Sequence, residues 1–102
     1  MELIKKAEAF VESGDRYMNE RMLTAALTAY RNAVYAAGAV FAYEETGILM
    51  HDEELKSFLE SRFPEVHAML VKCDSLEGNA EAIRATAMEL IEMAKKHVES
   101  EG

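Results

Sequence analysis

The chain has 102 residues, a length that suits one domain and leaves no room for a second. Half of its residues are hydrophobic and 29% are charged, so it has enough apolar material for a core and is not a disordered chain. The net charge is −8, and the only paired basic residues are Lys5–Lys6 and Lys95–Lys96. This balance argues against strong nucleic-acid binding by the chain alone and against attachment to an anionic membrane.

The cysteine count and the hydropathy pattern indicate the cellular compartment in which the protein is expected. Cys73 is the single cysteine, so an intrachain disulfide is excluded. Charged residues interrupt the start of the chain, and no run of about 18 apolar residues occurs anywhere. We therefore expect a cytoplasmic protein in a reducing environment.

The first predicted helix covers residues 2–13, where apolar residues recur at helical spacing. Gly14 is a plausible end for it, because glycine readily adopts the left-handed conformation that terminates many helices. Residues 15–19 fit either a loop or a continuation of the helix. The apolar face consists of Leu3, Ile4, Ala7, Phe10 and Val11.

The second predicted helix, residues 20–45, gives the strongest signal in the chain. It contains no proline and a single glycine, Gly38. It is apolar around much of its circumference, so we expect it to be the central element, packed on two sides. Large apolar residues at helical spacing run beside a row of small ones: Ala26, Ala29, Ala33, Ala36 and Ala37.

Two shorter helices and one long helix are predicted after Thr46–Gly47. Asp52 is expected to cap the third helix, and Pro64 suits the first position of the fourth. Residues 74–78 are expected to form a loop, and Asn79 to cap a final helix whose last residues, 99–102, fray. The sequence therefore predicts an all-α fold: residues 1–102 form a single antiparallel bundle of four to five helices with a long central second helix.

Tests for metal and nucleophile chemistry give no site. The Glu-x-x-His pairs of di-iron bundles are absent, and one cysteine cannot make a zinc knuckle. The acidic run after His51 fits a helix start better than a cation site, because consecutive helical residues do not converge. Cys73 is expected to be buried and structural. We expect neither a metal nor a cofactor.

One segment resembles a tetratricopeptide repeat. An aromatic, small and alanine pattern typical of that repeat falls at Phe10, Gly14, Tyr17, Ala26, Tyr30 and Ala33. A step of 34 residues, the period of the repeat, brings Gly14 to Ile48 and Tyr17 to His51, so the pattern does not recur. The resemblance is to one helix pair, and it implies a protein-binding module.

A broader resemblance, over about residues 1–65, is to the HEPN domain family of small prokaryotic helical-bundle proteins. It rests on the alanine- and tyrosine-rich run 29–37, followed by Gly47, His51 and Phe58. The resemblance implies a bundle that acts by homodimerisation or by pairing with a nucleotidyltransferase-type or antitoxin protein. We expect the interface to use the alanine-rich face of the second helix and an exposed residue of the last: Ala26, Ala29, Ala33, Ala37 and Met88.

An enzymatic alternative rests on Arg62 and His67. Catalytic members of the HEPN family carry an arginine and, four to six residues later, a histidine, and this spacing implies a metal-independent endoribonuclease toxin. Phe63 stands where those members usually have a polar residue. A binding role is therefore favoured over an enzymatic one, and a tetratricopeptide-like module is the third hypothesis.

Overall fold

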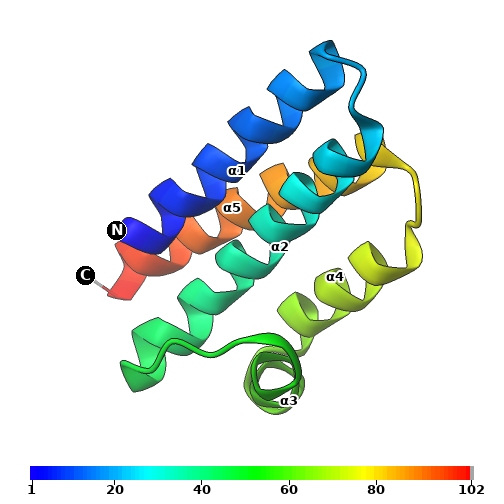
Figure 1. Ribbon diagram of the computed structural model, residues 1–102. Coiled ribbons are helices and arrows are strands. Elements are labelled where there is room, and N and C mark those ends of the chain that lie inside the picture. Colours follow the sequence, from blue (N-terminus) through cyan, green and yellow to red (C-terminus); the bar gives the residue numbers. More distant parts are fainter. Residues whose placement is uncertain (102) are drawn as a thin grey trace.

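The computed structural model describes residues 1–101, which form five α-helices and no strand (Figure 1). The helices are α1 (Glu2–Asn19), α2 (Leu23–Thr46), α3 (Asp52–Arg62), α4 (Pro64–Ser75) and α5 (Ala80–Glu101). The all-α prediction and the long second helix are confirmed.

Helix α2 is the centre of the bundle and contacts each of the other four helices. In Figure 1, α1 runs antiparallel to α2 beside it, and α5 passes behind both. Helix α4 flanks α2 on its other side, while α3 is seen end-on and therefore crosses the remaining helices. The molecule measures 38 × 25 × 18 Å.

The core is a continuous apolar cluster that contains side chains from all five helices. Complete burial of one leucine side chain stabilises the fold by about 1.5–3 kcal/mol. Burial of the apolar side chains in this core is therefore the main favourable contribution to the free energy of folding. The largest fully buried side chains are Leu55, Leu59, Leu70, Leu90, Val34 and Val40.

Gly14 is inside α1, so the prediction that it ends the first helix is wrong. Residues 15–19 continue the helix to Asn19. Glycine is required here for a different reason: a Cβ at position 14 would lie 2.6 Å from Cδ1 and 2.8 Å from Cζ of Tyr30. The missing side chain lets α1 and α2 approach closely, with the Tyr30 ring against the α1 backbone.

The helix ends follow most of the expected signals. Gly47 ends α2 in the left-handed conformation, with φ 72°, and Asn79 accepts a hydrogen bond from the backbone N–H of Ala82 at 3.1 Å as α5 begins. The expected Asp52 cap is wrong, because α3 already begins at Asp52, and His51 is its N-cap without a side-chain bond. Pro64 is the first residue of α4, as predicted.

Three element boundaries differ from the prediction. Helix α2 begins at Leu23 rather than at residue 20, because residues 20–22 turn the chain, with Arg21 at φ 59°. Helix α4 extends to Ser75, and α5 extends to Glu101 where fraying was expected. Residue 102, the last of the expected frayed end, lies outside the described residues.

Candidate functional site

A groove runs along the junction of α1 and α2. It consists of two hollows of about 780 and 280 Å³, which share Phe10 of α1 and Asn32 of α2 as lining residues. The larger hollow extends to Met22 and Leu23 at the α1–α2 turn, and the smaller reaches His51 at the start of α3. We call this surface the α1–α2 groove.

The groove exists because small residues of α2 lie beside large residues of α1. Ala25, Ala29, Asn32 and Ala36 follow each other at intervals of three and four residues, so they share one face of α2. On the opposite side of the groove, the partly buried aromatic rings of Phe10 and Tyr17 from α1 line it.

Apolar side chains are exposed where the groove opens. Met22 is 48% and Leu23 50% exposed in the larger hollow, and Leu49 is 44% exposed in the smaller. An exposed apolar patch that lines a concavity is typical of an interaction site. The groove can thus bury apolar side chains of another molecule.

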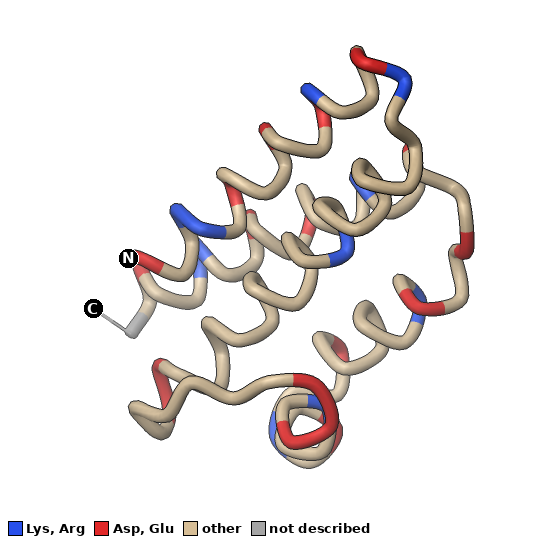
Figure 2. The backbone as a smooth tube through the Cα atoms, in the orientation of Figure 1, with Lys and Arg blue, Asp and Glu red and all other residues tan. Residues whose placement is uncertain are grey.

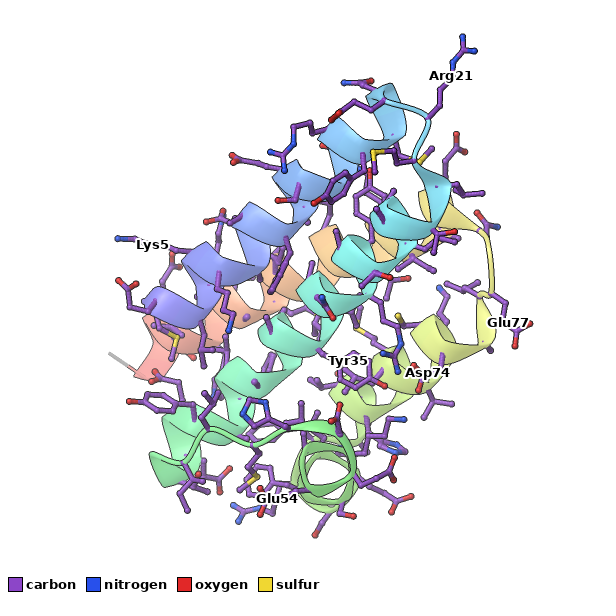
Figure 3. The ribbon with its side chains drawn as sticks, viewed as in Figure 1. Lys5, Arg21, Tyr35, Glu54, Asp74 and Glu77 are labelled. Atoms are coloured by element: carbon purple, nitrogen blue, oxygen red, sulfur yellow. The ribbon has the colours of Figure 1, made fainter. Side chains whose placement is uncertain are left out.

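A polar network next to the groove joins α2, α3 and α4 through one carboxylate. Asp74 accepts hydrogen bonds from the Tyr35 hydroxyl (2.8 Å to Oδ2) and from Lys56 Nζ (2.7 Å), and Arg31 adds an ion pair at 3.2 Å. Figure 3 shows Tyr35 and Asp74 facing each other between α2 and α4. Burial alone would raise the pKa of Asp74, but the bonds from Lys56 and Tyr35 outweigh it and hold that pKa below its ordinary value.

A second network joins α1, α2 and α5. Asp15 accepts hydrogen bonds from Arg84 Nε at 2.8 Å and from the Tyr30 hydroxyl at 2.5 Å. The bond from Arg84 lowers the pKa of Asp15, and burial together with the Asp15 carboxylate raises the pKa of Tyr30 to about 12. Each donor of both networks has an acceptor within the chain, so the networks fix helix positions rather than offering a ligand site.

The structure does not bring Arg62 and His67 together by a direct bond. Arg62 is the last residue of α3 and forms an ion pair with Glu45 of α2. His67 lies in α4, beyond the turn at Phe63, and no hydrogen bond or ion pair joins it to Arg62 within residues 1–101. The structure therefore shows no direct bond between the two side chains, and their catalytic role stays a prediction.

Most of the alanines expected at an interface face the chain's own core. Ala26, Ala33 and Ala37 are completely buried, so they allow close packing of helices inside the monomer. Ala29 is also buried, but it lines the larger hollow of the groove. Met88 is 41% exposed on α5, on a different surface from the groove.

The thiol of Cys73 is buried, and this burial outweighs the nearby cations Arg31 and Lys56. Burial raises its pKa to about 11, so it stays protonated at neutral pH. Within the described part of the chain, no three His, Cys, Asp or Glu side chains gather as a metal site.

Sequence reasoning missed the groove as a binding surface. A signal was present, since small residues occur on more than one side of α2. The row containing Ala26 and Ala33 is covered by neighbouring helices, whereas Asn32 is exposed and Ala25 and Ala36 are partly so. The row that stays open could be recognised only with the helices in place.

Comparison with known proteins adds no relative. No family model, no curated protein and no solved structure matches the chain. None of the helices in residues 1–101 combines the length and apolarity needed to cross a membrane.

Proposed function

We propose that this protein is a non-enzymatic helical binding module that takes an α-helical segment of a partner protein into the α1–α2 groove. The observation that supports this most is the groove itself, with Met22 and Leu23 half exposed at its larger hollow. In line with the HEPN resemblance, the partner class we favour is an associated protein such as a nucleotidyltransferase or an antitoxin.

A helix fits this groove better than an extended strand does. Both walls are α-helices, whose interior backbone groups are already bonded, so no free sheet edge is available for an added strand. Small side chains on α2 would let a third helix approach closely between α1 and α2. Along α1, the lining residues from Leu3 to Tyr17 span roughly 21 Å, the length of a helix of about 14 residues.

Selection from a displayed library of random peptides of roughly 16 residues tests this proposal, since that length spans the groove. The wild-type chain is compared with two variants. Asn32→Trp places a large side chain at a position that lines both hollows, and Ala85→Trp places one on the exposed face of α5. We expect peptides that bind the wild type and Ala85→Trp but not Asn32→Trp, with all three chains folded by circular dichroism. Equal recovery on all three would refute the groove as the binding site.

The endoribonuclease alternative has a separate test. Purified protein is incubated with single-stranded RNA, alongside Arg62→Ala and His67→Ala variants. The binding proposal predicts no cleavage by any of the three. Cleavage by the wild type that both substitutions abolish would instead establish the enzymatic hypothesis.

A further inference from the structure

The charged residues of α1 that line the hollow beside α5 differ in sign from the one that lines the groove. The side facing α5 carries Glu8, Glu12 and Asp15, which line a hollow shared with α5. The side facing the groove carries Lys6 and, beyond the end of α1, Arg21, and no carboxylate of α1 lines the groove. Figure 2 shows blue segments near the start of α1 and, next to a red one, at the α1–α2 turn.

The groove is cationic although the chain as a whole is strongly acidic. Its charged lining residues are Lys6, Arg21 and Arg31 against one carboxylate, Asp52, in a chain with 19 acidic and 11 basic residues. Arg31 already pairs with Asp74. A positive surface on an otherwise negative protein steers acidic partners to that surface and repels them elsewhere.

Two of these cations form no ion pair within the described chain. Among residues 1–101, Lys6 contacts only the Phe10 ring, with its Nζ 6.0 Å from the ring centroid, and Figure 3 shows the Arg21 side chain extending into solvent from the turn. They lie near opposite ends of the groove, because the α1 helix continues for roughly 20 Å beyond Lys6 before the turn. Carboxylates near both ends of a bound helix could therefore reach one cation each.

Resting on the proposed function, we infer that the helix received by the groove is acidic and amphipathic. Its apolar stripe packs on Phe10, Met22 and Leu23, and its flanking Asp or Glu side chains pair with Lys6 and Arg21. This occupant gives both cations an ion-pair partner and covers the exposed apolar side chains at the same time. A second copy of the chain and single-stranded RNA are the competing occupants.

The test uses the groove-dependent peptides from the library selection. The most enriched sequence is synthesised with a fluorophore, and its affinity is measured by anisotropy at low and high salt. Lys6→Gln with Arg21→Asn removes both cations, and asparagine tolerates the positive φ at position 21. The matched control, Lys5→Gln with Lys72→Gln, removes two exposed cations that line none of the groove.

We expect the groove-dependent peptides to carry more Asp and Glu than Lys and Arg. We also expect affinity to fall with salt and to fall about fivefold in the Lys6/Arg21 variant but not in the control. Neutral or basic groove-dependent peptides, or equal affinity in the two double variants, would overturn the inference and leave the binding module standing. Absence of any groove-dependent peptide would remove both claims.

Two further measurements distinguish the competing occupants. Light scattering over a range of protein concentrations detects self-association, and a dimer lost in Asn32→Trp would place a second copy in the groove. Titration with a fluorescent single-stranded RNA detects nucleic acid, and binding lost in Lys6→Gln/Arg21→Asn would assign the cations to phosphate. Either result would overturn the acidic-helix inference.

Discussion

The ring of Tyr30 lies against the backbone of α1 at Gly14, where no side chain fits. A Cβ at that position would meet three ring atoms of Tyr30, each closer than 3 Å. The contact sets the distance between α1 and α2, and its geometry is fixed further by the hydrogen bond from Tyr30 to Asp15. The two walls of the candidate groove are therefore held at a defined separation.

The first prediction concerns this contact. Gly14→Ala should destabilise the fold by about 1–3 kcal/mol, because overpacking outweighs the helix propensity that alanine gains. The comparison is Gly38→Ala, whose added Cβ would meet the movable Cδ1 of Leu70 at 3.0 Å. Thermal unfolding should show a larger loss for Gly14→Ala than for Gly38→Ala, and the opposite order would contradict the close approach.

The second prediction concerns acid stability. The pKa of Asp74 is lower in the folded chain than in the unfolded one, so its contribution is present above the unfolded pKa of about 4 and is lost as the pH falls through the folded pKa. Asp74→Asn should reduce the free energy of unfolding at pH 7 by about 1–3 kcal/mol. The free energy of unfolding of this variant should also fall less steeply as the pH is lowered.

Urea unfolding at pH 7 and at several acidic values measures this effect. Glu77→Gln is the matched control, since Glu77 points into solvent from the α4–α5 turn (Figure 3) and forms no ion pair within residues 1–101. We expect the control to follow the wild type. If Asp74→Asn also followed the wild type at every pH, the network around Asp74 would contribute nothing to stability.

The third prediction concerns alkaline pH. Burial and the neighbouring Asp15 raise the pKa of Tyr30 to about 12, so the neutral phenol favours the folded state, and this contribution is lost as the pH rises between about 10 and 12. The pKa of Tyr35 is raised as well, so ultraviolet absorbance of tyrosinate should show two late-titrating tyrosines in the wild type and one in Tyr30→Phe. If Tyr30→Phe instead lost absorbance that appears near pH 10, with the late-titrating part unchanged, the burial of the Tyr30 hydroxyl would be contradicted.

The fourth prediction concerns the alanines of α2. Ala33→Leu should destabilise the monomer by about 1–3 kcal/mol, because position 33 is completely buried in the chain's own core. Ala85→Leu, on the exposed face of α5, should change stability by less than about 0.5 kcal/mol. The loss in Ala33→Leu should be independent of protein concentration; a loss that disappears on dilution would mean that Ala33 packs against a second copy.

Much of the fold could be predicted from the sequence, because apolar spacing and the signals at Gly47, Pro64 and Asn79 act locally. The prediction for Gly14 is wrong because glycine serves both as a helix end and as a site of close packing, and only the position of Tyr30 distinguishes the two. The Asp74 network joins Tyr35 and Asp74 across 39 positions of the chain, so no local pattern reveals it.

The candidate site could not be predicted from the sequence, because its lining depends on how the helices pack. Ala29 and Ala33 have the same side chain and lie one helical turn apart, yet Ala29 lines the groove and Ala33 lies outside it. Which alanines remain open depends on where α1 and α5 pack. The roles expected of Arg62 and His67 remain predictions, to be decided by the RNA cleavage test.

Binding of a partner helix in the α1–α2 groove can be followed through the amide chemical shifts of the residues that line it. A ¹⁵N-labelled sample is titrated with the most enriched groove-dependent peptide while backbone resonances are followed residue by residue. We expect shifts concentrated at groove residues such as Phe10, Met22 and Asn32, with Met88 and the outer face of α5 unchanged. Shifts centred on α5 or on the exposed residues Tyr43 and Ile48, with the groove unaffected, would contradict it.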